Sequence, residues 1–148
     1  MSIDPVVRSV RVGLSPDAAF DLFTARMNEW WPVDSHSVSA GQGAPSKSLN
    51  MTGGIGGEIT EIAHDEATHT WGKIDEWSPG EAVAFTWHPG RTDGAETRVR
   101  VVFEADGDGT RVTLTHSDWE ALGEDAQTTR DGYAKGWVGV LDTLVAAA

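Results

Sequence analysis

The last 25 residues, 124–148, carry the most regular hydrophobic pattern of the chain. Their apolar and aromatic positions recur at steps of three and four residues, the spacing of one face of an α-helix: Tyr133, Trp137, Val140, Leu141, Leu144 and Val145. At roughly 1.5 Å per residue, a helix of about 22 residues reaches across a small domain. We therefore predict one long C-terminal helix.

Three glycines share one side of this predicted helix, Gly132, Gly136 and Gly139. Each glycine inside a helix costs about 1 kcal/mol relative to alanine. Two explanations fit this pattern. Either the helix packs very closely against a sheet on this side, or the glycines leave room for a ligand between helix and sheet.

The segment before the helix is typical of β-structure. Residues 6–14 alternate between apolar and polar positions, which predicts a half-buried first strand. Ser15-Pro16-Asp17 then predicts the start of a short helix, which ends before Pro32. Residues 33–48 have no periodicity and are predicted to form a loop. Turn residues separate the remaining predicted strands, at residues 48–52, 58–62, 68–77, 82–88, 97–105 and around 112–116.

The order of elements predicts the fold class. A sheet of this size needs cover for its apolar face, and the C-terminal helix is the only element long enough to provide it. We predict an α+β fold, in which a curved antiparallel sheet of about six to seven strands wraps around the long C-terminal helix, with short helices after the first strand. A length of 148 residues fits a single domain, residues 1–148.

The amino-acid composition makes some classes of binding partner unfavourable. Eleven basic and 23 acidic residues give a formal net charge of −12, which repels nucleic acid and anionic membrane surfaces. There is no cysteine, so disulfides and thiolate chemistry are excluded, and no apolar run approaches the ~20 residues of a membrane span. A cytoplasmic location is the default expectation.

Seven tryptophans are distributed over nearly every predicted element. They either fill and rim the space between sheet and helix, or line a pocket for a flat or apolar molecule. The residues we expect to bind such a ligand are Trp30, Trp31, Phe85, Trp87, His116, Tyr133, Gly136 and Trp137. The side on which Trp71 lies stays open, because one β-bulge would reverse it.

Candidates for catalysis and metal binding are few. His116 shares strand parity with inward-facing residues, so it is either a satisfied core histidine or an acid or base in the pocket. His36, in the loop after Trp30-Trp31-Pro32, is expected at the surface, with a position over the mouth of the pocket as the alternative. His64 and His69 flank an acidic turn without the spacing of a zinc site. The strand carboxylates are expected on the solvated face: Glu58, Glu61 and Glu76.

No nucleotide or nucleophile motif is present. The glycine run at residues 53–57 is not followed by a predicted helix, so it lacks the anion-binding helix start of a phosphate loop and is better explained by strand bends. The chain contains no G-x-S-x-G sequence. We expect neither a cofactor nor a metal.

A series of short motifs nevertheless resembles a known family. In chain order they are Ser15-Pro16-x-x-x-Phe20-x-x-Phe23-Thr24, Trp30-Trp31-Pro32, Gly56-Gly57-x-x-x-Glu61, Trp71-Gly72-x-Ile74-x-x-Trp77-x-Pro79, Phe85-Thr86-Trp87, Gly109-Thr110-x-Val112-x-Leu114-x-His116 and Gly136-Trp137-x-x-x-Leu141. This series covers almost the whole chain. It resembles the SRPBCC (START-like, helix-grip) superfamily, in the branch homologous to the C-terminal domain of the activator of the heat-shock protein 90 ATPase.

The resemblance implies a deep hydrophobic cavity between a curved sheet and the C-terminal helix. It does not select a function, since superfamily members include lipid carriers, cyclases, receptors and co-chaperone domains. We expect a non-catalytic binder of a small apolar or aromatic molecule. The alternatives are an enzyme of cyclase, hydrolase or detoxifying type that uses His116 in the same cavity, and a co-chaperone-like or stress-related module that binds a protein partner or forms a homodimer.

Overall fold

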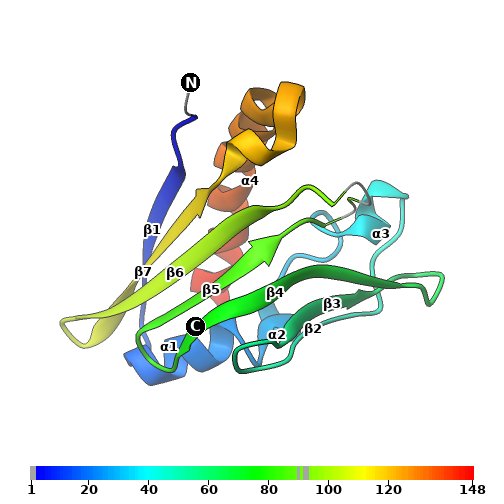
Figure 1. Cartoon of the computed structure of the whole chain (residues 1–148). Helices are drawn as coiled ribbons and strands as arrows, with labels where there is room; N and C mark the ends of the chain where they lie inside the picture. The colour runs from blue at the N-terminus through cyan, green and yellow to red at the C-terminus, as the bar shows by residue number, and fades with distance from the viewer. Residues whose placement is uncertain (1–2, 90, 92–93) are drawn as a thin grey trace.

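Seven strands form one antiparallel sheet in the order β1-β7-β6-β5-β4-β3-β2 in the computed structural model, which describes residues 3–89, 91 and 94–148 (Figure 1). In chain order the strands are β1 (Val6–Val12), β2 (Ser48–Met51), β3 (Glu58–Ile62), β4 (Thr68–Ser78), β5 (Ala82–Trp87), β6 (Thr97–Asp106) and β7 (Gly109–Ser117). The predicted α+β class and strand number are confirmed. Residues 90 and 92–93, between the strands predicted at 82–88 and 97–105, lie outside the described residues.

Tight turns join the neighbouring strands where the sequence predicts them. The β6–β7 hairpin closes with the pair Asp106↔Gly109, and Gly107 in its turn has a φ of 62°. The β4–β5 turn places Gly80 at a φ of 78°. Glycine adopts such positive φ values without the steric cost that a side chain would add. These local signals fix the order of the strands.

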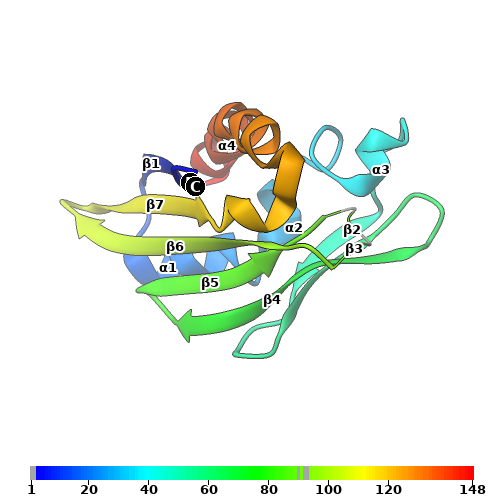
Figure 2. The same ribbon diagram turned by 45° about the horizontal axis from the view of Figure 1, so that its top comes forward.

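The long helix α4 (Ala126–Ala147) lies across one face of the curved sheet (Figure 2). It begins two residues later than the predicted position, because a 3₁₀ segment, η1 (Trp119–Asp125), precedes it and contains Gly123 at a φ of 68°. Trp137, Leu141 and Leu144 are buried against the sheet as predicted. Val145, which the spacing places on the same face, is instead 38% exposed.

Three short helices follow β1. They are α1 (Pro16–Phe23), α2 (Met27–Trp30) and α3 (Val38–Gly41). Ser15 caps α1 as predicted, since its hydroxyl accepts a hydrogen bond from the Ala18 amide at 3.2 Å. α3 lies in the segment predicted to be a loop. Its start is fixed by Ser37, whose hydroxyl accepts from the Ala40 amide at 3.0 Å.

Two bulges in β4 decide which of its side chains face α4. Gly72 pairs with Ile59 and Thr70 with Thr60, so that Trp71 between them is an extra residue. A second shift, between Ile74 and Glu76, follows three residues later. Trp71 and Ile74 are both buried despite their odd spacing. The open question about Trp71 is thereby settled, because the bulge turns its side chain inward.

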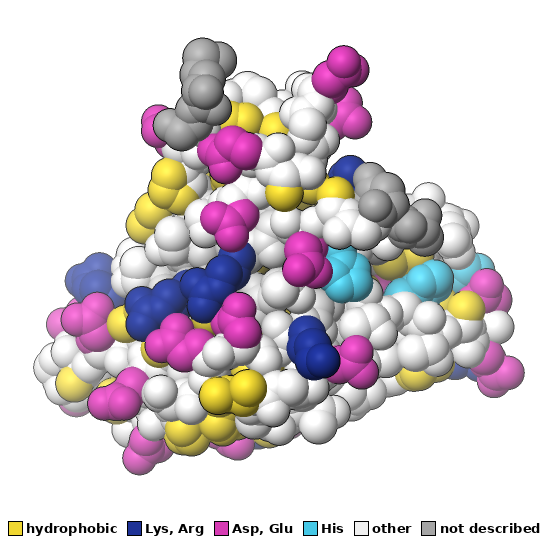
Figure 3. Space-filling model, in the orientation of Figure 1, with side chains coloured by type: hydrophobic (Ala, Val, Ile, Leu, Met, Phe, Trp, Pro, Cys, Tyr) yellow, Lys and Arg dark blue, Asp and Glu magenta, His cyan; other side chains and the backbone are white. Residues whose placement is uncertain are grey.

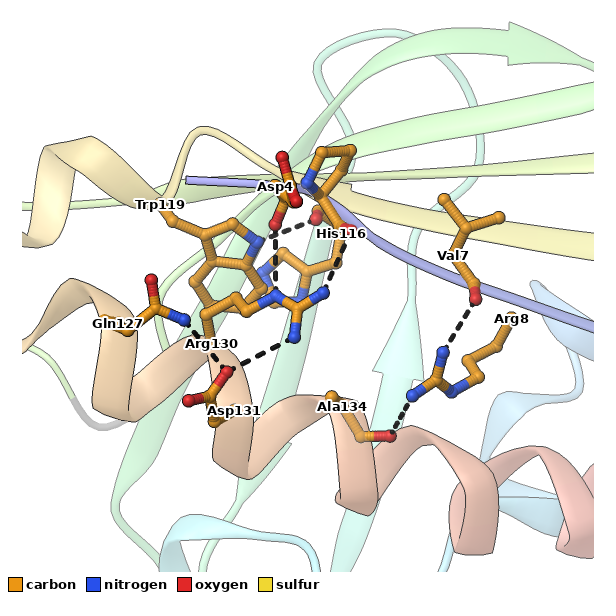
Figure 4. A network of polar contacts seen from close by, with 10 residues as sticks. Asp4, Val7, Arg8, His116, Trp119, Gln127, Arg130, Asp131 and Ala134 are labelled. Carbon is orange, nitrogen blue, oxygen red and sulfur yellow. Dashed lines mark hydrogen bonds and ion pairs between the residues drawn. The ribbon is translucent and has the colours of Figure 1, made fainter. Parts of the chain in front are cut away.

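The N-terminal residues are attached to the start of α4 by hydrogen bonds (Figure 4). The Arg130 guanidinium donates to the backbone oxygens of Asp4 and Pro5 at 3.1 and 3.3 Å. The Arg8 guanidinium donates to the Ala134 carbonyl of α4 at 3.0 Å. These contacts hold β1, an edge strand, against the helix.

The face of the sheet that points away from α4 carries basic and acidic side chains next to one another (Figure 3). Arg98 pairs with Asp75 at 2.8 Å and Arg100 with Glu76 at 2.8 Å. The hydrogen bond from Arg100 lowers the pKa of the Glu76 carboxyl. This placement of Glu76 agrees with the prediction. None of the helices in the described part of the chain is both long and apolar enough to cross a membrane.

Candidate functional site

A cavity of about 720 Å³ lies between the first half of α4, the sheet and the segment that contains α3. This volume is within the range of roughly 300–1,000 Å³ that is typical of small-molecule sites. Its lining consists of Trp31, Ser35, His36, Ser37, Val38, Gly41, Gln42, Trp71, Trp87, Pro89, Thr129, Gly132, Tyr133, Gly136, Trp137 and Val140. Most of its wall is therefore aromatic or aliphatic.

Four tryptophans from separate elements meet at this wall. The ring centroid of Trp31 lies 5.4 Å from Trp71, 5.8 Å from Trp87 and 5.8 Å from Trp137. Trp87 is also 5.5 Å from both Trp71 and Trp137. These distances, with mostly tilted or edge-to-face geometry, are those of favourable aromatic pairs. The rings support one another and form a rigid apolar surface.

The indole N–H groups of these four rings all donate to protein acceptors. Trp31 donates to the His36 carbonyl at 2.6 Å, and Trp71 to the Glu61 carboxylate at 3.0 Å. Trp87 donates to the Tyr133 hydroxyl at 3.1 Å, and Trp137 to Nδ1 of His116 at 3.0 Å. The tryptophans consequently offer the cavity their carbon surfaces rather than their polar groups.

The helix glycines beside the cavity do not serve close packing. A Cβ atom built on Gly132 or Gly139 meets nothing within 4 Å, and one on Gly136 meets only the His36 ring, at 3.8 Å. Gly132 and Gly136 line the cavity, whereas Gly139 does not. Of the two explanations that the sequence offers, close packing on the sheet is wrong. Gly132 and Gly136 leave space open beside the cavity.

Glu61 is the main correction to the sequence analysis, which places it on the solvated face. Its side chain is completely buried, because it shares the inward parity of Ile59 on β3. The carboxylate accepts from the amides of Val38 and Ser39 at 2.8 and 3.0 Å, in addition to the Trp71 indole. A single buried carboxylate thus joins the α3 segment, residues 35–42, to the aromatic wall.

His116 is buried next to the cavity but does not line it. Its Nδ1 accepts from Trp137, and its Nε2 is 2.6 Å from the Thr97 hydroxyl. Burial lowers the pKa of His116 from 6.5 to about 3, so the ring is neutral at physiological pH. Both nitrogens are occupied, as in the satisfied core histidine that the sequence analysis offers as one alternative.

The residues predicted to bind a ligand divide into two groups. Trp31, Trp87, Tyr133, Gly136 and Trp137 line the cavity. The others are part of the packed core: Trp30, which donates to the Leu22 carbonyl at 2.8 Å, Phe85 and His116. Strand alternation does not separate the two groups, because Phe85 and Trp87 lie on the same face of β5 and only Trp87 lines the cavity.

Several lining residues were not predicted. Trp71 depends on the bulge in β4, and Gly132 follows from the glycine spacing on α4. His36, expected at the surface with a position over the pocket mouth as the alternative, is half-buried and lines the cavity, with its Nδ1 2.7 Å from the Ser35 hydroxyl. Among the residues that the structure describes, no group of three or more His, Cys, Asp or Glu side chains is placed to hold a metal ion.

A curved antiparallel sheet that grips a long C-terminal helix, with an aromatic cavity between them, defines the helix-grip (START-like, SRPBCC) class. The chain belongs to the family described as "Activator of Hsp90 ATPase homolog 1-like protein", whose model matches residues 14–148. The resemblance drawn from the sequence motifs is therefore confirmed. A comparison with curated proteins finds no match.

Several solved structures share the fold of this chain. An anthrahydroquino-γ-pyrone synthase, Txn09, solved in complex with SUM, is 26% identical with a TM-score of 0.65, over 99% of this chain and 98% of that chain. The Aha1 dimer from Colwellia psychrerythraea is 16% identical with a TM-score of 0.61, over 97% of both chains. A protein from Mesorhizobium loti, MLL2253, is 15% identical with a TM-score of 0.69, over 97% of this chain and 95% of that chain.

Proposed function

We propose that this protein binds a small, flat apolar or aromatic molecule in the cavity between α4 and the sheet. The observation that carries the proposal is the aromatic wall, whose four indole N–H groups all have protein acceptors. A ligand that covers the carbon surfaces of these rings removes apolar area from water, at a gain of roughly 25 cal/mol per Å². It does so without displacing any of these four hydrogen bonds.

The glycines of α4 support the same proposal. Gly132 and Gly136 weaken the helix by about 1 kcal/mol each relative to alanine, and they face space that alanine would partly fill. A binding site that needs this room explains the cost. The 26% identical synthase, solved in complex with SUM, adds support for a small molecule as the partner.

Catalysis is less well supported by the geometry. The candidate acid or base, His116, has both ring nitrogens engaged with Trp137 and Thr97, and it lies outside the cavity lining. Before His116 could take a proton from a ligand, the hydrogen bond at its unprotonated ring nitrogen would have to break. The similarity to a synthase keeps turnover as the alternative, with a catalytic group other than His116. Binding of a protein partner remains a prediction from the net charge of −12.

The first experiment is native mass spectrometry of freshly purified protein beside the mass of the denatured chain. A mass that is lost on denaturation shows a co-purified ligand and gives its chemical class. The purified protein is then titrated with 9-fluorenone, a planar three-ring ketone, by isothermal titration calorimetry. We expect binding at micromolar or better affinity.

Two substitutions in α4 locate the binding site. Gly136→Leu adds a side chain that projects toward the cavity, and we expect it to weaken 9-fluorenone binding at least 10-fold. Gly139→Leu is the matched control, because it makes the same change in the same helix at a position that does not line the cavity. Equal affinity of the two variants would place the ligand elsewhere and overturn the proposal.

A further inference from the structure

A directional series of hydrogen bonds runs behind the aromatic wall. It begins at the Trp137 indole, which can only donate and gives its hydrogen to Nδ1 of His116 at 3.0 Å. In the neutral ring the hydrogen is therefore on Nε2, which donates to the Thr97 hydroxyl at 2.6 Å. The Thr97 hydroxyl in turn donates to the Trp87 carbonyl at 3.2 Å.

The side chain of Trp87 adds a second group that can only donate a hydrogen bond. Its indole N–H donates to the Tyr133 hydroxyl at 3.1 Å. Since the Tyr133 oxygen is the acceptor in this contact, its own hydrogen must point to another acceptor. None of the residues that the structure describes accepts a hydrogen bond from this hydroxyl. Burial raises the pKa of Tyr133, so the hydroxyl keeps its hydrogen at physiological pH.

Tyr133 also occupies a distinctive position on the wall. It lines both the large cavity and a neighbouring space of about 210 Å³, and the indole N–H groups around it are already in use. A planar hydrocarbon that excludes water from the large cavity would leave this donor without a partner, which is unfavourable. A ligand with an oxygen at its edge would satisfy it.

We infer that Tyr133 is the specificity-determining residue of the site, and that its hydroxyl donates a hydrogen bond to a carbonyl oxygen at the edge of a planar aromatic ketone. This inference rests on the proposed function and narrows its ligand class. The tryptophans bind any flat ring system of suitable size. Tyr133 selects those that carry the oxygen, and it fixes their orientation in the cavity.

The test compares two probes of the same outline, fluorene and 9-fluorenone, which differ in the carbonyl group. Isothermal titration calorimetry gives the Kd of each for the wild-type protein and for Tyr133→Phe. We expect the wild type to bind 9-fluorenone roughly 5- to 10-fold more tightly than fluorene, the value of one net hydrogen bond. In Tyr133→Phe this preference should disappear, with the Kd of fluorene changed by no more than about twofold.

Infrared spectroscopy supplies a readout that a structural role of Tyr133 would not move. The carbonyl stretch of bound 9-fluorenone should lie at lower frequency in the wild type than in Tyr133→Phe. Thr143→Val serves as a control, because it removes a hydroxyl from the same helix outside the cavity lining. It should keep both the preference and the frequency.

The outcomes separate this inference from the proposed function. Equal wild-type affinity for the two probes, or a preference that survives in Tyr133→Phe, overturns the role of Tyr133 and leaves the cavity as a binding site. Failure of the wild type to bind either probe overturns both. The comparison of the two probes on the wild-type protein needs no variant, so it decides the question even if Tyr133→Phe does not fold.

Discussion

The two ends of the space between sheet and helix are built from the same kinds of residue but differ in what they enclose. At one end, the ring centroids of Phe20 and Phe103 are 5.3 Å apart, and those of Phe23 and Trp30 are 5.2 Å apart, in a filled core. At the other end, tryptophan rings at spacings of 5.4–5.8 Å surround a cavity. Aromatic packing alone therefore does not distinguish a core from a site.

The difference comes from the helix that both ends share. Leu141 and Leu144 of α4 are buried and fill the space beside them, whereas Gly132 and Gly136 in the first half of the helix leave theirs open. Because protein interiors are otherwise close-packed, a cavity forms beside bulky side chains only where the facing residues have small side chains or none. The missing side chains at Gly132 and Gly136 leave a cavity beside the first half of α4, whereas the leucines of the second half complete a core.

The largest expected effect concerns the wall of the open end. Glu61→Ala leaves three N–H donors without an acceptor, the buried ones of Ser39 and Trp71 and the partly buried one of Val38. We expect the free energy of unfolding to fall by about 3 kcal/mol, measured by urea denaturation. Glu58→Ala, on the same strand but exposed, should change it by less than about 0.5 kcal/mol. Equal losses in the two variants would show that the carboxylate does not hold the wall together.

The next effect concerns His116, which is buried behind the wall of the open end, beside Tyr133 and Trp137. Its pKa is about 3 in the folded protein against 6.5 ordinarily, so between these values the unfolded chain binds the additional proton. Stability therefore falls as the pH falls. From pH 7 to pH 5, above the range in which most carboxylates titrate, we expect this histidine to account for a loss of about 2 kcal/mol.

Urea denaturation at both pH values measures this loss, and His116→Gln should remove it. The comparison uses the change between the two pH values within each protein, so a uniform destabilisation by the substitution cancels. A wild type and a variant with the same pH dependence would contradict a neutral buried His116.

The smallest expected effect on stability concerns the open space beside Gly132 of α4. Gly132→Ala should raise the free energy of unfolding by about 1 kcal/mol, since the added methyl group meets no atom within 4 Å and alanine is the better helix former. Gly72→Ala should lower the free energy of unfolding, because its Cβ would overlap the carbonyl oxygen of Thr86 on the neighbouring strand. Thermal denaturation of the two variants compares them. A loss of stability in Gly132→Ala would mean that this side of the helix is closely packed.

Much of the fold was predictable from local sequence. Alternation defined the strands, glycine and aspartate defined the hairpin turns, and the three- and four-residue spacing defined α4. These signals depend on neighbours in the chain, and the ordered motifs pointed to the same superfamily. The content of the cavity wall was also partly predictable, since Trp31, Trp87, Tyr133, Gly136 and Trp137 line it.

The sequence by itself determined that an aromatic, glycine-bearing helix would lie against a sheet, and the tertiary structure alone decided which side chains face the cavity. One extra residue in β4 turned Trp71 inward, and the approach of the α3 segment gave the buried Glu61 its partners. Trp30, Phe85 and His116 face the same interior as the cavity residues but are enclosed by other side chains. Strand register and contacts between distant segments make these choices, and neither is encoded in the spacing of residues along the chain.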